Sequence, residues 1–360
     1  MALSSPLLWL PLSAFAAATV LHILALTLFP KIGLLDYPER YGLKRHRLPY
    51  PTGLLAVCTF LLFFAILQTF VSDPPWTAQA IGLTGAVVLL AVVSFLDDRT
   101  PLPCWLRLLV QVIIALAIFL TGTRIYSLTN PLVLLTGHEV IHLDTLMIQS
   151  HLLRSPSLVG ALFTVVWLGL TMNALNWADG VRGQVSTLST IGFLTIGFLS
   201  LSARVNDPAL ALLAFVLASI SAACILFDFP PAHVLLGDTG SMFFGLLLGV
   251  LTIYSGGKVA TGFLVLGVPL IDSGIVVFRR LRKGTSPFRG STGNEHLHHR
   301  LLKKGWSERQ IVFLTAGLGT LFGTTALFLN TFEKFLSAVA LFLIMLWLSL
   351  YSGRKGKAFF

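Results

Sequence analysis

The stretch Thr171-Met-Asn-Ala-Leu-Asn-Trp-Ala-Asp-Gly-Val-Arg-Gly183 places polar groups directly at the end of a long apolar segment. Asn173, Asn176 and Gly180 follow helical spacing, so they are expected to share one helix face. Asp179 comes immediately before Gly180, where glycine favours the end of the helix. Two carboxamides and a carboxylate at a membrane boundary are unfavourable unless they bind something. We expect the remaining chain to bring further charged clusters to this point.

The composition around this stretch is that of a membrane protein. The 360 residues are 55% hydrophobic and only 11% charged, whereas a soluble domain usually has about 25% charged residues. We expect an all-α, polytopic membrane fold that forms a single domain over residues 1–360, and its first helix is expected to be retained rather than cleaved. About eleven apolar runs are long enough to cross a bilayer, near 5–29, 52–71, 78–96, 103–122, 158–176, 184–203, 208–227, 239–255, 259–278, 309–329 and 333–352.

Lys and Arg divide unequally between the two sides of this predicted topology. One side, with the connections 30–51, 97–107, 177–183, 228–238 and 279–309 and the C-terminus, carries 20 basic residues, and the other side carries 5. The positive-inside rule therefore predicts that the first side is cytoplasmic, with the N-terminus outside and the C-terminus inside. Topology then explains most of the net charge of +10, and attraction of anionic lipid or substrate is a compatible secondary role.

An acidic pair, Asp97 and Asp98, lies at the cytoplasmic end of the third predicted span. Adjacent carboxylates repel each other, so one of them tends to be protonated unless a cation is near. The pair can be a solvated helix end with Arg99 as its partner, or it can bind a metal or activate an acceptor. Arg107 begins the next span on the same side and can contact a phosphate.

The sequence GDTGS, which begins at Gly237, leads into the eighth predicted span. Glycines near Asp238 allow a tight backbone, and the hydroxyl of Thr239 or Ser241 can cap the helix, whose free N–H groups favour an anion. A carboxylate next to such an anion suits a bridging divalent cation. The alternative is a simple capped helix start.

The sequence NEHLHHRLLKKG, from Asn294 to Gly305, predicts a short amphipathic helix in the membrane interface, with Asn294 as its cap. We expect its histidines to hold phosphates or a nucleotide together with Arg300, with the first and last of them on one face. A bare interfacial helix is one alternative, and a transition-metal site is another, although no cysteine or spaced acid completes a tetrahedron. The histidines are His296, His298 and His299.

Two further features are less specific. The first cytoplasmic connection carries a compact cation group from Lys44 to Arg47, which can bind phosphate or simply reflect the positive-inside rule. Asp272 is an acid within the ninth predicted span, and we expect it to pair with a buried cation or with the cytoplasmic basic cluster. The outer connection 123–157 is expected to be a solvated loop with an extended segment at 140–143.

The ordered set DD (97–98), NxxNxxDG (173–180), GDxGS (237–241) and HxHH (296–299) resembles the polyprenyl-phosphate N-acetylhexosamine-1-phosphate transferases. The resemblance covers nearly the whole chain and is strongest to the branch that transfers GlcNAc-1-phosphate from UDP-GlcNAc to undecaprenyl phosphate, which starts envelope glycans such as O-antigen lipopolysaccharide or teichoic-acid linkage units. Relatives often carry a Pro-Asp-Arg stretch before the first histidine, whereas this chain has Thr292-Gly-Asn-Glu295. Arg289 or Arg300 would have to replace that arginine. The alternatives are phospho-N-acetylmuramoyl-pentapeptide transferase and a secondary transporter with polar residues in broken helices.

The resemblance implies a phosphoryl transfer at the cytoplasmic face of the inner membrane, within the connections 30–51, 97–107, 177–183, 228–241 and 279–308. A lipid phosphate oxygen attacks the β-phosphorus of a UDP-N-acetylhexosamine and UMP leaves, with Mg²⁺ or Mn²⁺ spreading the charge. The implied partners are the sugar nucleotide, a polyprenyl phosphate and the bilayer, without nucleic acid and with room for a homodimer. The implied roles are catalysis by Asp97, Asp98, Asp179 and Asp238, metal binding by Asn176 and Asp238, and substrate binding by Lys44, His46, Arg107, Asn173, Asn176, Gly180, His296, His298, His299 and Arg300.

Overall fold

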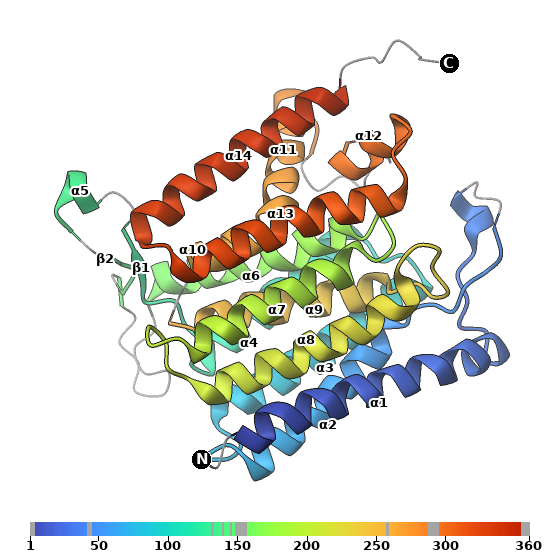
Figure 1. Cartoon of the computed structure of the whole chain (residues 1–360), viewed down its shortest axis with the longest axis horizontal. Coiled ribbons are helices and arrows are strands. Elements are labelled where there is room, and N and C mark those ends of the chain that lie inside the picture. The colour runs from blue at the N-terminus through green and yellow to red at the C-terminus, as the bar shows by residue number, and fades with distance from the viewer. Residues whose placement is uncertain are drawn as a thin grey trace.

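Long apolar helices make up most of the structure (Figure 1). The computed structural model describes residues 4–41, 45–130, 133–138, 140–144, 146–147, 157–256, 259–286 and 295–353. Within these residues, nine helices are long and apolar enough to cross a membrane, which confirms the all-α, polytopic prediction. They are α1 (Ser4–Lys31), α2 (Gly53–Phe70), α3 (Ala78–Arg99), α6 (Leu158–Ala178), α7 (Gln184–Leu201), α8 (Pro208–Asp228), α9 (Gly237–Tyr254), α13 (Glu308–Phe328) and α14 (Thr331–Gly353).

Two of the predicted spans take other forms. The span predicted at 103–122 is α4 (Cys104–Leu120), a shorter apolar helix of 17 residues. The span predicted at 259–278 is not one straight helix, because it consists of α10 (Val259–Val265) and α11 (Gly267–Arg282), whose axes differ by 85°. Apolar composition specifies that a segment prefers lipid or core, but it does not specify that the segment is straight.

The remaining elements are short and lie at the two ends of the molecule (Figure 1). One end carries β1 (Ser127–Thr129), α5 (Val133–Thr136) and β2 (Val140–His142), where the two strands pair antiparallel. The extended segment predicted at 140–143 is thereby confirmed. The other end carries α12 (Leu297–Lys303), and the 3-10 turn η1 (Pro38–Tyr41) is the remaining short element.

The centre of the bundle is α9, in which every residue except Asp238 and Tyr254 is buried. It packs on α2, α3, α6 and α7. It approaches α6 closely, because a Cβ on Gly245 would lie 2.6 Å from the carbonyl oxygen of Thr171. Only glycine permits backbones to approach so closely. This contact fixes the end of α6, with its polar motif, against the start of α9.

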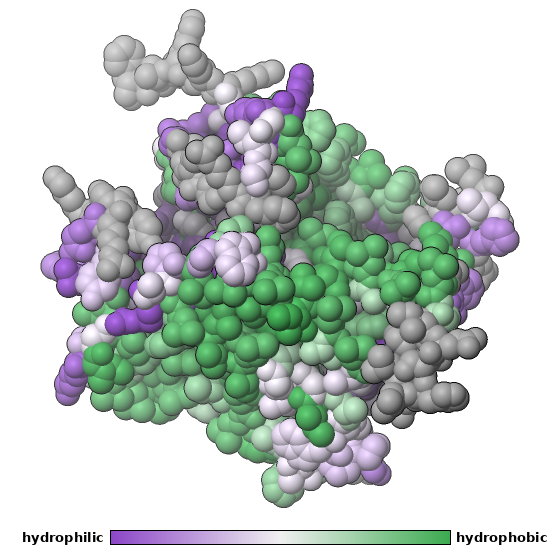
Figure 2. Space-filling view, turned by 180° about the vertical axis from the view of Figure 1, so that it is seen from behind, coloured by the Kyte–Doolittle hydropathy of each residue, from purple (hydrophilic) through white to green (hydrophobic). Residues whose placement is uncertain are grey.

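The outer surface of the bundle is broadly apolar. Figure 2 shows one face with hydrophobic residues across its middle and hydrophilic residues gathered towards its margins. Many large apolar side chains are exposed on the outer helices, including Leu162, Phe278 and Trp347. An apolar surface of this extent needs a partner other than water, and a lipid bilayer supplies it. The chain is therefore a multi-pass membrane protein.

Candidate active site

The start of α9 is held by a carboxylate from α3. Asp98 accepts hydrogen bonds from the backbone N–H groups of Asp238, at 2.8 Å, and Thr239, at 3.0 Å. The hydroxyls of Thr239 and Tyr50 each donate to the same carboxylate at 2.5 Å. The prediction that Thr239 or Ser241 caps its own helix is therefore wrong. The N–H groups do bind an anion, as helix starts favour, but that anion is Asp98 rather than a substrate.

Glycines make this junction close enough to form. Gly237 has φ = +79°, and a Cβ there would lie 2.9 Å from Oδ2 of Asp98 and 2.7 Å from Cβ of Pro51. The starts of α2 and α9 also touch, because a Cβ on Gly53 would lie 2.2 Å from the backbone nitrogen of Gly240. Glycine thus occupies the positions at which the starts of α2 and α9 and the end of α3 meet around the carboxylate of Asp98.

Asp97, next to Asp98, faces a different set of groups. Its Oδ1 accepts the backbone N–H of Leu102 at 2.6 Å, and its Oδ2 lies 3.0 Å from Nη1 of Arg107. The same arginine nitrogen lies 3.5 Å from Oδ2 of Asp238. Arg99, which the alternative interpretation paired with the acids, instead donates to the carbonyl of Gly33. Two carboxylates from separate helices therefore share one guanidinium, and the adjacent aspartates differ in their surroundings.

Two residues at the end of α6 complete the acidic cluster. Asn176 donates to Oγ of Ser241 at 3.2 Å and also contacts the carboxylate of Asp238. Asp179 caps the helix. Burial raises the pKa of the Asp179 carboxyl well above its usual range, and the carboxylates of Asp238, Asp228 and Asp98 raise that pKa further. In the described part of the chain, Asp179 has no hydrogen bond or ion pair from its side chain, so negative charge is concentrated here without full compensation.

The described side chains of this cluster are too few to surround a metal ion without other ligands. Among the described residues, no group of three or more His, Cys, Asp or Glu side chains is arranged to hold a metal ion. Mg²⁺, however, is usually held by one or two carboxylates together with substrate phosphates and water. Asp97 and Asp238, which share Arg107, and the amide of Asn176 fit that mode. The arrangement suits a cation that takes its other ligands from a diphosphate.

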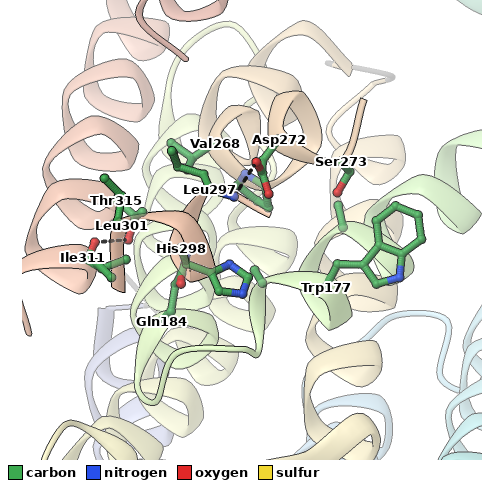
Figure 3. A pocket seen from close by; sticks show the side chains of 13 residues that line it. Trp177, Gln184, Val268, Asp272, Ser273, Leu297, His298, Leu301, Ile311 and Thr315 are labelled. Atoms are coloured by element: carbon green, nitrogen blue, oxygen red, sulfur yellow. Dashed lines mark hydrogen bonds between the residues drawn. The ribbon is translucent and has the colours of Figure 1, made fainter. Parts of the chain in front are cut away.

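The histidine cluster is attached to α11. His296 Nδ1 hydrogen-bonds to Oδ2 of Asp272 at 2.8 Å, and the backbone N–H of Leu297 donates to Oδ1 of the same carboxylate at 2.9 Å. Figure 3 shows Asp272 above the first turn of α12, with Trp177 of α6 nearby. The prediction that Asp272 pairs with the basic cluster is confirmed. The predicted cap, Asn294, lies outside the described residues, and the residue preceding the first turn is His296.

His298 lies against the end of α6. A Cβ on Gly180 would be 2.1 Å from Nε2 of His298, so glycine is required for this contact. The ring of His298 is parallel to that of His296 at 5.7 Å and lies 4.1 Å from that of His299. The prediction that His296 and His299 share a face without His298 is wrong, because the ring of His298 lies against both of the other rings. Burial, followed by the two neighbouring histidines, lowers the pKa of His298 well below its usual value.

His298 also borders a cavity of about 10 Å³, which is close to the size of one water molecule (Figure 3). Its Nε2 has no hydrogen-bond partner among the described residues, and neither do Oε1 of Gln184 and Oγ of Ser273, which line the same cavity. Three unsatisfied polar atoms around one small space are unusual in a folded protein. They indicate a place for a bound water or a substrate atom.

Several predicted site residues are engaged elsewhere. Asn173 shares the expected face of α6, but its amide donates to Oε1 of Gln111 at 2.6 Å, which links α6 to α4. Arg300 directs Nη1 towards Oγ of Ser349 on α14 at 3.3 Å. His46 is exposed, and Lys44 lies outside the described residues. The structure therefore joins Asn173 and Arg300 to the site by their helices rather than by direct contact.

The cation group of the first loop is partly neutralised by its own acids. Arg45 pairs with Asp36 at 2.5 Å, and Arg47 pairs with Glu39 at 3.2 Å. His46 contributes its carbonyl to Arg45. Of the cations expected to bind the acceptor, Arg107 is the one whose described contacts lie within the acidic cluster.

Sequence reasoning missed three residues of the site. Tyr50, which binds Asp98, lies between two prolines just before α2, and a rigid loop with an aromatic hydroxyl was the available signal. Gln111 is an amide within an otherwise apolar span, which by itself indicates a polar partner in the membrane. Asp228 ends α8 and accepts a hydrogen bond from Ser186. Tyr50 contacts the acidic cluster directly, and Asp228 acts on it through its electrostatic effect on Asp179.

Comparisons with known proteins support the sequence resemblance. The family model described as Glycosyl transferase family 4 matches residues 80–256, which include α3, α4 and α6 to α9 with the acidic cluster. The chain is 25% identical over 333 residues to the "Probable undecaprenyl-phosphate N-acetylglucosaminyl 1-phosphate transferase" of Bacillus subtilis, covering 91% of this chain and 86% of that protein.

Other relatives extend the similarity to the rest of the chain. The "Undecaprenyl-phosphate alpha-N-acetylglucosaminyl 1-phosphate transferase" of Escherichia coli K12 is 24% identical over 359 residues, with 96% of this chain and 90% of the relative covered. The protein of the same name from Yersinia pestis is 28% identical over 312 residues, with 81% and 77% covered. The family match includes the helices that build the acidic cluster, and the relatives span most of the molecule. The chain is therefore similar to glycosyl transferase family 4 over the helices of the acidic cluster, and it is a membrane enzyme that transfers a sugar phosphate.

Proposed function

We propose that the enzyme transfers GlcNAc-1-phosphate from UDP-GlcNAc to undecaprenyl phosphate, forming undecaprenyl-diphospho-GlcNAc and UMP. The observation that carries this proposal is the pair of carboxylates, Asp97 and Asp238, gathered by Arg107 at one end of the membrane helices. The names of the relatives support the choice of donor and acceptor. The reaction is the first membrane step of a cell-envelope glycan.

The acidic cluster is proposed to bind the diphosphate of the donor through Mg²⁺. When bound, Mg²⁺ supplies neutralisation of the charge on the transferred phosphate. Asp238 and Asn176 are the proposed ligands, and they already contact each other at the junction of α6 and α9. Because both side chains are fixed by that junction, the binding geometry exists before substrate arrives.

The two adjacent aspartates are proposed to act differently. Asp98 accepts four hydrogen bonds and therefore positions the start of α9 rather than meeting a substrate. Asp97 contacts Leu102, Arg107 and the carboxylate of Asp238, and it is the better candidate to orient the acceptor phosphate. Arg107 holds Asp97 and Asp238 together and can turn its other N–H donors to a phosphate.

The histidines and the end of α6 are proposed to form the donor side of the site. His298 is buried against Gly180, and its lowered pKa keeps the ring neutral near pH 7. A neutral ring can donate one hydrogen bond or accept one. Asp179 is proposed to help shape the nucleotide pocket, because it faces the carboxylate of Asp238 without a partner of its own.

The site is proposed to face the cytoplasm from the cytoplasmic (inner) membrane. The supporting observation is the excess of Lys and Arg in the connections at the end that carries the site. A secondary transporter would place polar groups at a helix break. The break between α10 and α11 is instead flanked by buried, apolar Leu264, Val265 and Leu266.

A donor panel tests the proposed function. Purified protein is given undecaprenyl phosphate with UDP-GlcNAc, UDP-GalNAc or UDP-MurNAc-pentapeptide, and UMP and the lipid product are measured with and without chelator. We expect product from UDP-GlcNAc that disappears with chelator and returns with Mg²⁺ or Mn²⁺. Turnover of UDP-MurNAc-pentapeptide alone would favour the muramoyl-pentapeptide alternative, and uptake of intact UDP-GlcNAc into vesicles without UMP release would favour a transporter.

A further inference from the structure

Two arginines outside the acidic cluster converge on one hydroxyl. Arg279 of α11 donates from Nη2 to Oγ of Ser349 at 2.7 Å, and Arg300 of α12 donates from Nη1 to the same atom at 3.3 Å. Ser349 is buried in α14. Arg300 also packs on the last turn of α14, where a Cβ on Gly353 would lie 2.1 Å from its Nη2. Three helices thus meet around two guanidinium groups.

These two positive charges have no direct ion-pair partner among the described residues, although Asp272 lies close enough to raise the pKa of Arg300. In the described part of the chain, neither Arg279 nor Arg300 forms an ion pair, and the neighbouring acids are bound elsewhere. Asp272 holds His296 and the start of α12, and Glu295 pairs with Arg280 at 2.5 Å. The C-terminus of α14 offers only about half a negative charge. Burial and then Arg279 lower the pKa of Arg300, which is the direction expected for an uncompensated pair.

The surroundings are those of a membrane interface. Phe278 and Leu281, on either side of Arg279, expose apolar side chains. On α14, the rings of Trp347 and Tyr351 stack at 5.7 Å, and Nζ of Lys304 lies 4.0 Å from the centre of the Tyr351 ring. Trp, Tyr and basic residues together are typical of the level of lipid headgroups. A ligand here would have a charged head and an apolar body.

We propose that Arg279, Arg300 and Ser349 bind the phosphate of an anionic phospholipid, in the leaflet on the side of the acidic cluster. Guanidinium groups bind phosphate oxygens in pairs, and basic pockets between membrane helices are known to hold lipid headgroups. Within the described part of the chain, none of the three residues forms a hydrogen bond or ion pair with Asp97, Asp98 or Asp238. The bound phosphate would tie α11, α12 and α14 together, and it would thereby hold the histidines of α12 in place.

The test measures lipid binding directly, so its result does not depend on the proposed reaction. Wild-type protein, Arg279→Gln and Arg282→Gln are transferred to phosphatidylcholine nanodiscs with or without phosphatidylglycerol, and retained lipid is measured by native mass spectrometry. Arg282 is the matched control, because it is an exposed arginine on the same helix and has no hydrogen bond or ion pair to a described residue. We expect retained phosphatidylglycerol in the wild type and in Arg282→Gln, and about tenfold weaker retention in Arg279→Gln.

Four outcomes would overturn the proposal. Equal loss in Arg282→Gln would show general attraction of the basic surface, and unchanged retention in Arg279→Gln would exclude the site. Displacement of the lipid by inorganic phosphate would identify a small-anion site instead. Displacement by undecaprenyl phosphate, with the same dependence on Arg279, would make it an acceptor site. If Arg279→Gln does not fold, Ser349→Ala provides the same comparison with a smaller expected loss.

Discussion

The starts of α9 and α12 are built in the same way but with different support. Each helix is held at its first turn by an aspartate from another helix, Asp98 for α9 and Asp272 for α12. Asp98 accepts four hydrogen bonds inside the bundle, whereas Asp272 accepts one from a backbone N–H and one from His296. α9 has 18 residues and is almost wholly buried, and α12 has seven.

This difference indicates that the two parts of the site are held in place to different degrees. The carboxylates at the start of α9 belong to the most enclosed helix, so their geometry is set by the fold. The histidines lie on a short helix at the end of a bent segment, and their position depends on a few contacts with α6, α11 and α14. We therefore expect changes at α9 to affect chemistry directly and changes at α12 to act through position.

The largest effect is expected from Asp238→Asn. The substitution keeps the shape of the side chain but removes the charge that faces Asp97 and Arg107. We expect UMP release to fall by on the order of a hundred- to a thousandfold, with unchanged helix content by circular dichroism. Turnover close to that of the wild type would remove the acidic cluster from the mechanism.

The next effect is expected from Gly180→Ala. The added methyl group would lie 2.1 Å from Nε2 of His298, so α12 must shift. A displacement of about 1 Å at a catalytic group can lower the rate about a hundredfold, and kcat/KM reports it. Gly169→Ala within α6, the helix that Gly180 follows, is the control, because a Cβ there has nothing within 4 Å. If both variants keep wild-type activity, the contact between α6 and α12 does not matter for turnover.

The third prediction compares the two aspartates that hold the starts of α9 and α12. Asp98→Asn disturbs four hydrogen bonds and Asp272→Asn disturbs two. Hydrogen bonds to charged groups contribute about 1.5–3 kcal/mol each, so Asp98→Asn should lower the apparent melting temperature in detergent more than Asp272→Asn does. Asp272→Asn should also reduce activity about tenfold while the bundle remains folded. A larger thermal effect at Asp272 would reverse the comparison.

The smallest effect is expected from Tyr50→Phe. The change removes one of the four donors to Asp98 and leaves the other three. We expect a loss of about 1 kcal/mol in stability and little change in turnover. Burial and then Asp98 raise the pKa of the Tyr50 hydroxyl, so it remains a donor at neutral and moderately alkaline pH. Thermal unfolding scans at pH 7 and pH 9 should therefore show the same difference between Tyr50→Phe and the wild type.

Most of the helices could be located from the sequence because a bilayer requires long apolar segments. The candidate site could be predicted from the sequence for the same reason, because Asp97, Asn176, Asp238 and His298 are polar residues at or near the ends of such segments. The break at Leu266 was missed because both α10 and α11 are apolar near it, although Gly267 and Pro269 directly after it were the available signal. The group that accepts the first N–H groups of α9 was also predicted wrongly. The sequence around a helix start does not show whether a nearby hydroxyl or a distant carboxylate accepts these N–H groups.

The sequence by itself determined the membrane class, the positions of the apolar helices and the end of the molecule at which unusual polar residues collect. Those features follow from the transfer of side chains between water and lipid, which depends on each segment alone. Only the tertiary structure decided that Asp98 holds α9 while Asp97 remains near Arg107, and that Arg300 turns to Ser349. These assignments depend on which helices are neighbours, because a hydrogen bond forms only between groups that packing brings within about 3 Å.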